Sequence, residues 1–183
     1  MNPTTVLELS AAHAQGHTNQ AIANHLGLSL STVKRYKQRL GLGSNDARNT
    51  LGRQGEHLVA EVLTGLGLKV HVTPSGHPYD IQADGWRLEV KTSSTPVSGQ
   101  YRFRLNSRRS SNHARYRYTK NYLFDSDFLL LAIVEDEVLQ HLYCLPTAFG
   151  TPNLWVQPTS PFCPYAAYLG ALHLLSAPSA TAV

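Results

Sequence analysis

The sequence predicts two domains of different class, a small all-α domain followed by a larger α/β domain. Apolar residues with helical spacing run through residues 1–43, whereas residues 51–176 combine one amphipathic helix with the alternating and continuous apolar stretches typical of β-strands. The stretch around residues 44–50 is rich in Gly, Ser, Asn and Asp and is expected to be a linker. Residues 177–183 are expected to form a flexible tail.

The composition indicates a globular protein of a reducing compartment. Of the 183 residues, 42% are apolar, which is enough for a core. The two cysteines, Cys144 and Cys163, have neither the density of a disulfide scaffold nor the spacing of a zinc site. No apolar run is long enough to cross a bilayer, and the first residues lack the features of a secretion signal. We therefore expect a cytoplasmic protein with no membrane partner and no small-molecule cofactor.

Three short helices are expected in the first domain. Apolar positions with helical spacing cover Thr4–Ala14, Asn19–Leu26 and Thr32–Leu40. Thr18 precedes the second helix as an N-cap, and a nearby serine can cap the third. The domain is therefore predicted to be a compact bundle of three helices.

The segment from Asn19 to Tyr36, with a small Ala23 in its first helix and Gly27 in the turn, resembles the helix-turn-helix of bacterial DNA-binding proteins. The resemblance implies that the third helix enters the major groove, with its start nearest the base edges. The candidate DNA contacts on the polar and basic face are Ser31, Thr32, Lys34, Arg35, Lys37 and Gln38. The alternative for a three-helix unit is an oligomerisation or protein-docking module.

The second domain is predicted to begin with a helix, a strand and a β-hairpin. Apolar residues form one stripe along Leu51–Leu68, and Lys69–Thr73 is expected to be a strand. Residues 79–84 and 86–91 each alternate apolar and polar side chains around the turn signal Asp84-Gly85. This pattern predicts two antiparallel strands joined by a tight turn.

Three charged residues are expected to converge on this hairpin. Strand side chains repeat every two residues, so Glu89 and Lys91 share one face, and Asp80 meets them where the register allows. Mg²⁺ binds one or two carboxylates together with water and phosphate oxygens, so the two acids suit Mg²⁺, with Mn²⁺ as a substitute. Lys91 can orient or deprotonate an attacking water and offset charge on the transition state. The alternative is a solvated strand face.

Pro78-x-Asp80 followed by Glu89-x-Lys91 resembles the motif of the PD-(D/E)XK nuclease superfamily. Tyr79 separates the proline from the aspartate, which are adjacent in many members, so the proline receives no role. The resemblance implies a restriction endonuclease-like core, in which helices flank a mixed β-sheet.

The superfamily often uses a helix glutamate as a further metal or water contact, and Glu56 has the matching position here. The alternative role of this residue is a favourable interaction with the helix dipole. The catalytic residues implied by the resemblance are Glu56, Asp80, Glu89 and Lys91, and the implied metal ligands are the three acids.

A basic segment follows the hairpin. Between Thr92 and Phe124 there is no Asp or Glu, and aromatic, amide and hydroxyl residues are interspersed with the basic ones. This composition is typical of a surface that follows a phosphate backbone. The candidate DNA contacts are Arg102, Arg104, Arg108, Arg109, Arg115, Arg117 and Lys120. The alternative is a basic loop with only non-specific attraction to polyanions.

The remaining residues are expected to complete the core. Phe128–Val134 is a continuous apolar run, as in a buried central strand, and His141–Leu145 is its expected partner. Prolines recur from Pro146 to Pro164, which predicts a surface loop. Tyr165–Leu175 is expected to be a closing helix.

These features together predict a Mg²⁺-dependent endodeoxyribonuclease that hydrolyses phosphodiester bonds of duplex DNA and is guided by its helix-turn-helix. Cleavage of both strands by a chain with one site favours a homodimer or a higher homo-oligomer. The resemblance covers restriction and homing enzymes as well as Holliday junction resolvases, so a branched-DNA resolvase is an alternative. A non-catalytic DNA-binding regulator on a nuclease-like scaffold is another. An RNA nuclease is less favoured, because a helix-turn-helix suits the B-form major groove.

Overall fold

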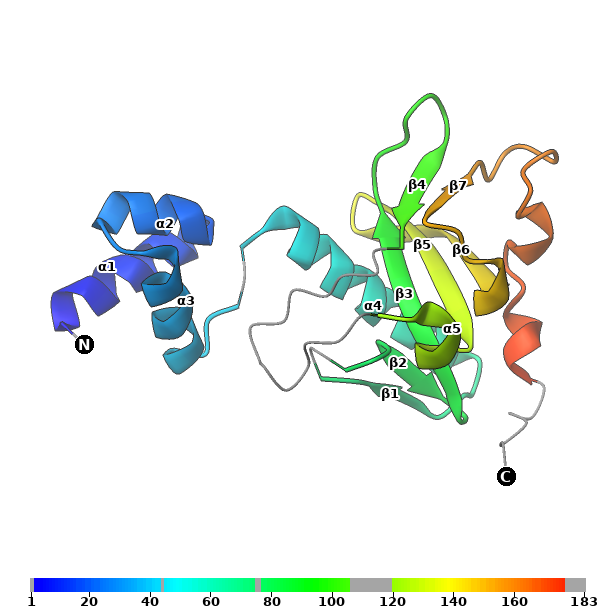
Figure 1. Ribbon diagram of the computed structural model, residues 1–183, viewed down its shortest axis with the longest axis horizontal. Coiled ribbons are helices and arrows are strands. Elements are labelled where there is room, and N and C mark those ends of the chain that lie inside the picture. The colour runs from blue at the N-terminus through cyan, green and yellow to red at the C-terminus, as the bar shows by residue number, and fades with distance from the viewer. Residues whose placement is uncertain (1, 44, 75–76, 106–119, 177–183) are drawn as a thin grey trace. The chain divides into compact units, whose positions relative to one another are not determined.

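The computed structural model divides the chain into two compact units, Met1–Thr50 and Leu51–Val183 (Figure 1). The predicted tail, residues 177–183, lies outside the part of the chain that the structure describes. The described residues are 2–43, 45–74, 77–105 and 120–176. Each unit has a hydrophobic core of its own.

The first unit contains the three predicted helices, α1 (Pro3–Ala14), α2 (Asn19–Leu26) and α3 (Leu30–Arg39). The side chain of Thr18 caps α2 by accepting a hydrogen bond from the Ala21 backbone at 3.2 Å, as the sequence predicts. The third helix is capped in the same way by a serine and therefore begins two residues earlier than expected. The buried core of the unit consists of Leu9, Ala12, Ile22, Ala23 and Val33.

Helix α4 (Ala47–Gly65) begins inside the stretch predicted as a linker, so residues 47–50 are helical. The backbone N–H of Thr50 donates to the carbonyl of Asp46 at 2.9 Å, which extends the helical hydrogen-bonding pattern to this point. The polar composition of this stretch predicts a linker. Polar residues can nevertheless form the first turn of a helix when packing stabilises the later turns of the same helix. No helix in the described part of the chain is long and apolar enough to span a bilayer.

The second unit is built on a mixed five-stranded sheet with the strand order β1-β2-β3-β5-β6 (Figure 1). Its strands are β1 (Val70–Val72), β2 (Ile81–Ala83), β3 (Trp86–Ser93), β5 (Phe128–Glu135) and β6 (Val138–Pro146). Only β3 and β5 pair in parallel, and the other neighbours in this sheet are antiparallel. The predicted central strand and its partner are therefore confirmed as β5 and β6.

The predicted hairpin is formed by β2 and β3, with Ile81 opposite Leu88. Asp84 and Gly85 both have positive φ, 45° and 92°, as a two-residue type I′ turn requires. The Asp84 side chain also accepts a hydrogen bond from the Lys69 backbone at 3.0 Å, which ties the turn to the start of β1. The turn chemistry in the sequence therefore sets the register of the hairpin.

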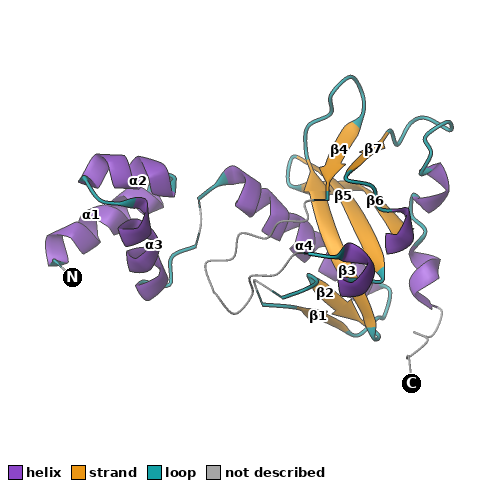
Figure 2. Cartoon of the chain, viewed as in Figure 1, coloured by secondary structure: helices purple, strands orange, loops and turns teal. Residues whose placement is uncertain are grey.

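Two expectations for the later part of the chain are wrong. The proline-rich stretch is not only a loop, because β7 (Asn153–Val156) pairs antiparallel with β4 (Tyr101–Arg104) in a second, two-stranded sheet (Figure 2). The expected closing helix is instead two short 3₁₀ helices, Ala166–Tyr168 and Leu172–Ser176, because Gly170 has a φ of +67° between them. Two further short helices are α5 (Tyr122–Asp125) and η2 (Thr147–Phe149).

Strand β5 is buried on both faces and joins two hydrophobic clusters. Its even-numbered positions from 130 to 134 pack in one cluster with Val59 and Leu63 of α4. Its odd-numbered positions from 129 to 133 pack in the other cluster with Phe103 of β4. This explains why the run in the sequence is continuous rather than alternating.

Helix α4 lies close to β3 at Gly55. A Cβ atom built on Gly55 would lie 1.9 Å from the hydroxyl oxygen of Thr92, which is shorter than any real contact. A glycine is therefore needed at this position for the helix to lie against the strand. The next residue, Glu56, is close enough to Asp80, Glu89 and Lys91 for their charges to act on its carboxyl group.

Replacement of Gly55 by Ala is expected to destabilise the protein by about 1–3 kcal/mol, because the added methyl group overpacks this contact. Gly52→Ala, in the same helix, is the matched control, since the added Cβ meets nothing within 4 Å. It should be neutral or stabilising by about 0.5–1 kcal/mol. Urea unfolding followed by circular dichroism measures both free energies, and equal effects of the two substitutions would contradict the packing argument.

Candidate active site

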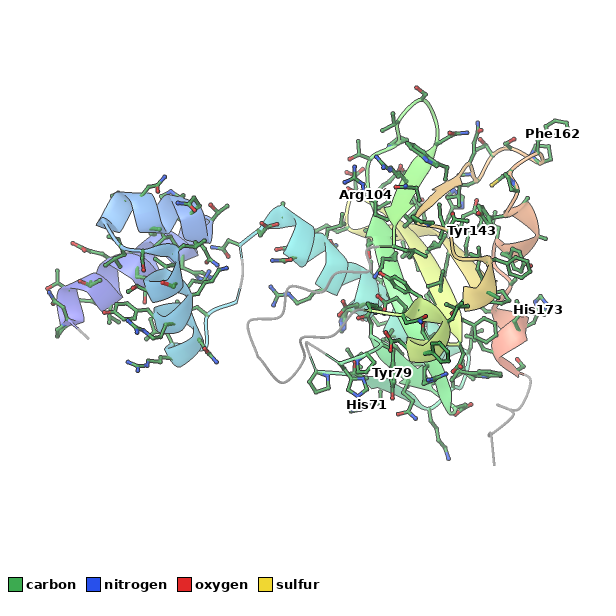
Figure 3. All side chains as sticks on the ribbon, in the orientation of Figure 1. His71, Tyr79, Arg104, Tyr143, Phe162 and His173 are labelled. Atoms are coloured by element: carbon green, nitrogen blue, oxygen red, sulfur yellow. The ribbon has the colours of Figure 1, made fainter. Side chains whose placement is uncertain are left out.

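Asp80 is held at the start of β2 by backbone hydrogen bonds on both sides. Its N–H donates to the carbonyl of Leu88 at 3.0 Å, and its carbonyl accepts from the N–H of Thr73 at 2.9 Å. One carboxylate oxygen, Oδ2, accepts from the backbone N–H of Val90 at 2.9 Å. Figure 3 labels the preceding residue, Tyr79, at this end of the sheet. The carboxylate is therefore fixed beside β3, across the hairpin from Glu89.

Glu89 is the central residue of the site. Its side chain is 3% exposed, and each of its oxygens forms an ion pair with a different lysine. Oε1 accepts from Nζ of Lys91, two residues along the same strand, and Oε2 accepts from Nζ of Lys120. A buried carboxylate of this kind is stable only when its charge is compensated and its oxygens are hydrogen-bonded.

Lys120 belongs to this cluster and not to an exposed basic surface. Its side chain is 2% exposed, and Nζ also donates to the carbonyl of Pro78 at 2.9 Å. The ring of Tyr122 lies beneath both ammonium groups, 4.8 Å from Nζ of Lys120 and 5.6 Å from Nζ of Lys91. The sequence predicts Lys120 as a phosphate contact because of its basic neighbours, but the pairing with Glu89 spans 31 residues and has no local signal.

Burial and neighbouring negative charges raise the pKa of two of the three acids, Glu56 and Asp80. Burial, followed by the charge of Asp80, raises the pKa of Glu56 to about 7. Burial, followed by the charge of Glu89, also raises the pKa of Asp80. Burial opposes the charged form of Lys91, but Glu89, Tyr122 and Asp80 outweigh it, so the pKa of Lys91 is raised. The cluster as a whole contains the carboxylates of Glu56, Asp80 and Glu89 and the ammonium groups of Lys91 and Lys120. When all five are ionised, one negative charge is left uncompensated.

The donor set of this cluster fits a hard divalent cation. Glu56, Asp80 and Glu89 supply only oxygen ligands, as Mg²⁺ and Mn²⁺ prefer, and their mutual repulsion would be relieved by a bound cation. Among the described residues, no three acidic, His or Cys side chains are close enough as they stand to form a complete metal site. Both oxygens of Glu89 contact ammonium groups, so a metal ligated by Glu89 must either share one of these oxygens with an ammonium group or displace it.

The candidate DNA contacts of α3 lie mainly on its exposed face. Most of them are exposed, and Thr32 is half-buried near the helix start. Lys37 is different, because it is 3% exposed and follows the core residue Val33 by one helical turn. The exposed members of the predicted set are Ser31, Lys34, Arg35 and Gln38.

Two arginines of the basic segment lie on β4, where Arg102 and Arg104 are exposed and Phe103 between them is buried. The guanidinium of Arg102 donates to Oδ1 of Asn153 and lies 5.4 Å from the ring centroid of Trp155 on β7. Arg104 is labelled on the same strand in Figure 3. The remaining predicted contacts, Arg108, Arg109, Arg115 and Arg117, lie outside the described residues.

The chain is structurally similar to a bacterial homing endonuclease, I-Ssp6803I. The TM-score is 0.54 and the sequence identity 16%, and the match covers 70% of this chain and 91% of that one. No protein-family model and no curated protein matches the sequence. At this identity the similarity establishes the fold, which is α/β and restriction endonuclease-like, with N-terminal helices followed by a mixed five-stranded sheet. The predicted fold class is therefore confirmed.

The raised pKa of Glu56 predicts a pH-dependent stability. Between the ordinary value of 4.5 and about 7, the folded protein keeps a proton on this carboxyl group that the unfolded chain has lost. The free energy of unfolding therefore falls as the pH rises through this window. Glu56→Gln removes this dependence. Between pH 4.5 and pH 7, the free energy of unfolding of the wild type is therefore expected to fall by about 2 kcal/mol more than that of Glu56→Gln.

Urea unfolding at several pH values measures this difference. The control is Glu61→Gln, because Glu61 lies on the same helix with a side chain that is 61% exposed. It should follow the wild-type pH profile. Parallel profiles for wild type and Glu56→Gln would show that the carboxyl group of Glu56 is not perturbed.

Proposed function

We propose that this protein is a Mg²⁺-dependent endodeoxyribonuclease that hydrolyses phosphodiester bonds of duplex DNA and is directed to its site by the N-terminal helix-turn-helix. The observation that supports this most strongly is the cluster of Asp80, Glu89 and Lys91 on a restriction endonuclease-like sheet. Glu89 is 2% exposed and ion-paired, which is unusual for a solvated strand face and typical of an organised site.

The side chains of the cluster have separate roles in this proposal. Asp80, Glu89 and Glu56 would hold the metal, which supplies a Lewis acid for the phosphate and a more acidic water. Lys91 places an ammonium group beside the acids, where it offsets negative charge on the phosphate in the transition state. Glu56 lies within reach of the charges of Asp80, Glu89 and Lys91, where its carboxylate could orient the attacking water or accept a proton from it.

DNA is proposed to contact both units. The start of α3 carries exposed polar and basic side chains that can reach base edges and phosphates. On the second unit, Arg102 and Arg104 project from one face of β4 and can bind the phosphate backbone. A homodimer is proposed as the active form, because one site per chain cuts only one strand at a time.

A non-catalytic DNA-binding protein is the second candidate. It is favoured by one observation, the occupation of both Glu89 oxygens by ammonium groups, which neutralises the carboxylate without a metal. The two candidates differ in whether a divalent ion binds and whether DNA is cut.

Glu89→Gln and Lys91→Met are each expected to reduce Mg²⁺-dependent cleavage of plasmid and branched DNA by at least about 100-fold, because they remove a ligand charge and a transition-state charge. Glu61→Gln, an exposed change of the same type, should cleave as wild type. Initial rates on both substrates also separate a duplex endonuclease from a junction resolvase. Equal cleavage by wild type and both site variants would exclude this site, and no cleavage by wild type would favour the regulator.

Lys34→Ala and Arg35→Ala are each expected to weaken DNA binding on any sequence if the side chain contacts a phosphate, and to lower the slope of log affinity against log salt by about 1. Fluorescence anisotropy at several salt concentrations measures both quantities. Lys69→Ala removes an equal charge from an exposed position of the second unit and should leave the slope unchanged. Unchanged slopes for Lys34→Ala and Arg35→Ala would place the DNA-binding face elsewhere.

A further inference from the structure

The proposed reaction assigns a role to one of the two lysines that bind Glu89 and leaves Lys120 unexplained. Lys120 comes from outside the hairpin and is the more deeply buried of the two, with a side chain 2% exposed against 24% for Lys91. Burying an ammonium group costs several kcal/mol unless it is fully compensated. A buried ammonium group that is already bound to protein oxygens is not available to a phosphate at the surface, so the burial points to a function inside the site.

The contacts of Lys120 hold it in one place. Its Nζ donates to Oε2 of Glu89 and to the carbonyl of Pro78, and the ring of Tyr122 lies 4.8 Å away. These partners come from three different segments of the chain, β3, the approach to β2, and α5. Lys120 therefore connects Glu89 to the segment that leads into Asp80.

The contacts of Lys91 are looser. Its Nζ donates to Oε1 of Glu89, makes only a long 3.4 Å contact to the carbonyl of Val90, and lies farther from the Tyr122 ring, at 5.6 Å. Its charge acts on Asp80 more strongly than that of Lys120 does, and it also acts on Glu56. The ammonium group that binds Oε1 is therefore the one whose charge acts more on the other two acids.

We infer that Lys120 is a positioning residue that holds Glu89 by Oε2, so that Oε1 is the oxygen offered to a divalent ion. Lys91 is then the ammonium group that leaves Glu89 when the ion binds, while Lys120 stays in place. This inference rests on the proposed function, because it concerns the metal ligand Glu89. It gives the two lysines different roles although both pair with the same carboxylate.

The first test follows the two lysine ammonium groups in the full-length protein by ¹H–¹⁵N NMR during titration with Mg²⁺. Lys91→Arg and Lys120→Arg assign the two Nζ signals. The expected result is that Mg²⁺ shifts or broadens the Lys91 signal and leaves the Lys120 signal in place. Displacement of the Lys120 signal would overturn the inference. Unchanged signals for both lysines, with no heat of Mn²⁺ binding, would contradict the metal-dependent function itself.

The second test separates positioning from DNA binding by kinetics. Lys120→Met is expected to lower kcat for cleavage by about 10- to 100-fold while the Kd for DNA stays within about twofold of wild type, and Lys120→Arg should restore part of kcat. Lys69→Met, an exposed change of the same type, should leave both quantities unchanged. A raised Kd with unchanged kcat would overturn the inference in favour of a phosphate contact. If Lys120→Met does not fold, Lys120→Arg and the wild-type NMR titration decide.

Discussion

The buried carboxylate of Glu89 is the constraint on which the rest of the second unit depends. At 2% exposure its charge is tolerable only with strong partners, and the chain supplies an ammonium group to each oxygen. One of them, Lys91, comes from the same strand, but Lys120 must be delivered from another segment, and Tyr122 lies under both. Compensation of this one charge therefore connects β3 to segments that are distant from it in the sequence.

The scaffold around this charge is rigid because β3 is paired on both sides. Strand β2 fixes it through a type I′ turn, and β5, buried on both faces, fixes it in a parallel register on the other side. Helix α4 completes the arrangement by approaching β3 where Gly55 has no side chain. A site in which charges must be held to within fractions of an ångström needs this kind of support from regular elements.

The parts that could be predicted from the sequence are those with short-range signals. The alternation around Asp84-Gly85 predicts the hairpin and, with it, the meeting of Asp80, Glu89 and Lys91. Cap residues and helical spacing predict the first three helices. The position of Lys120 has no such signal, because it depends on a pairing over 31 residues. The sequence does not predict strand β7 for a related reason, since its pairing with β4 is long-range and prolines are frequent in the surrounding sequence.

The electrostatics of the cluster connect metal, proton and phosphate binding in the proposed function. With every group ionised, the site has one more negative than positive charge, so a phosphate alone meets net repulsion in a partly buried environment. A proton on Glu56, whose pKa is about 7, reduces this repulsion but removes a base and a ligand. A bound divalent cation would reverse the net charge and favour the ionised form of the carboxylates. Cation and phosphate are therefore expected to bind cooperatively, because each reduces the cost of the other's charge in the same site.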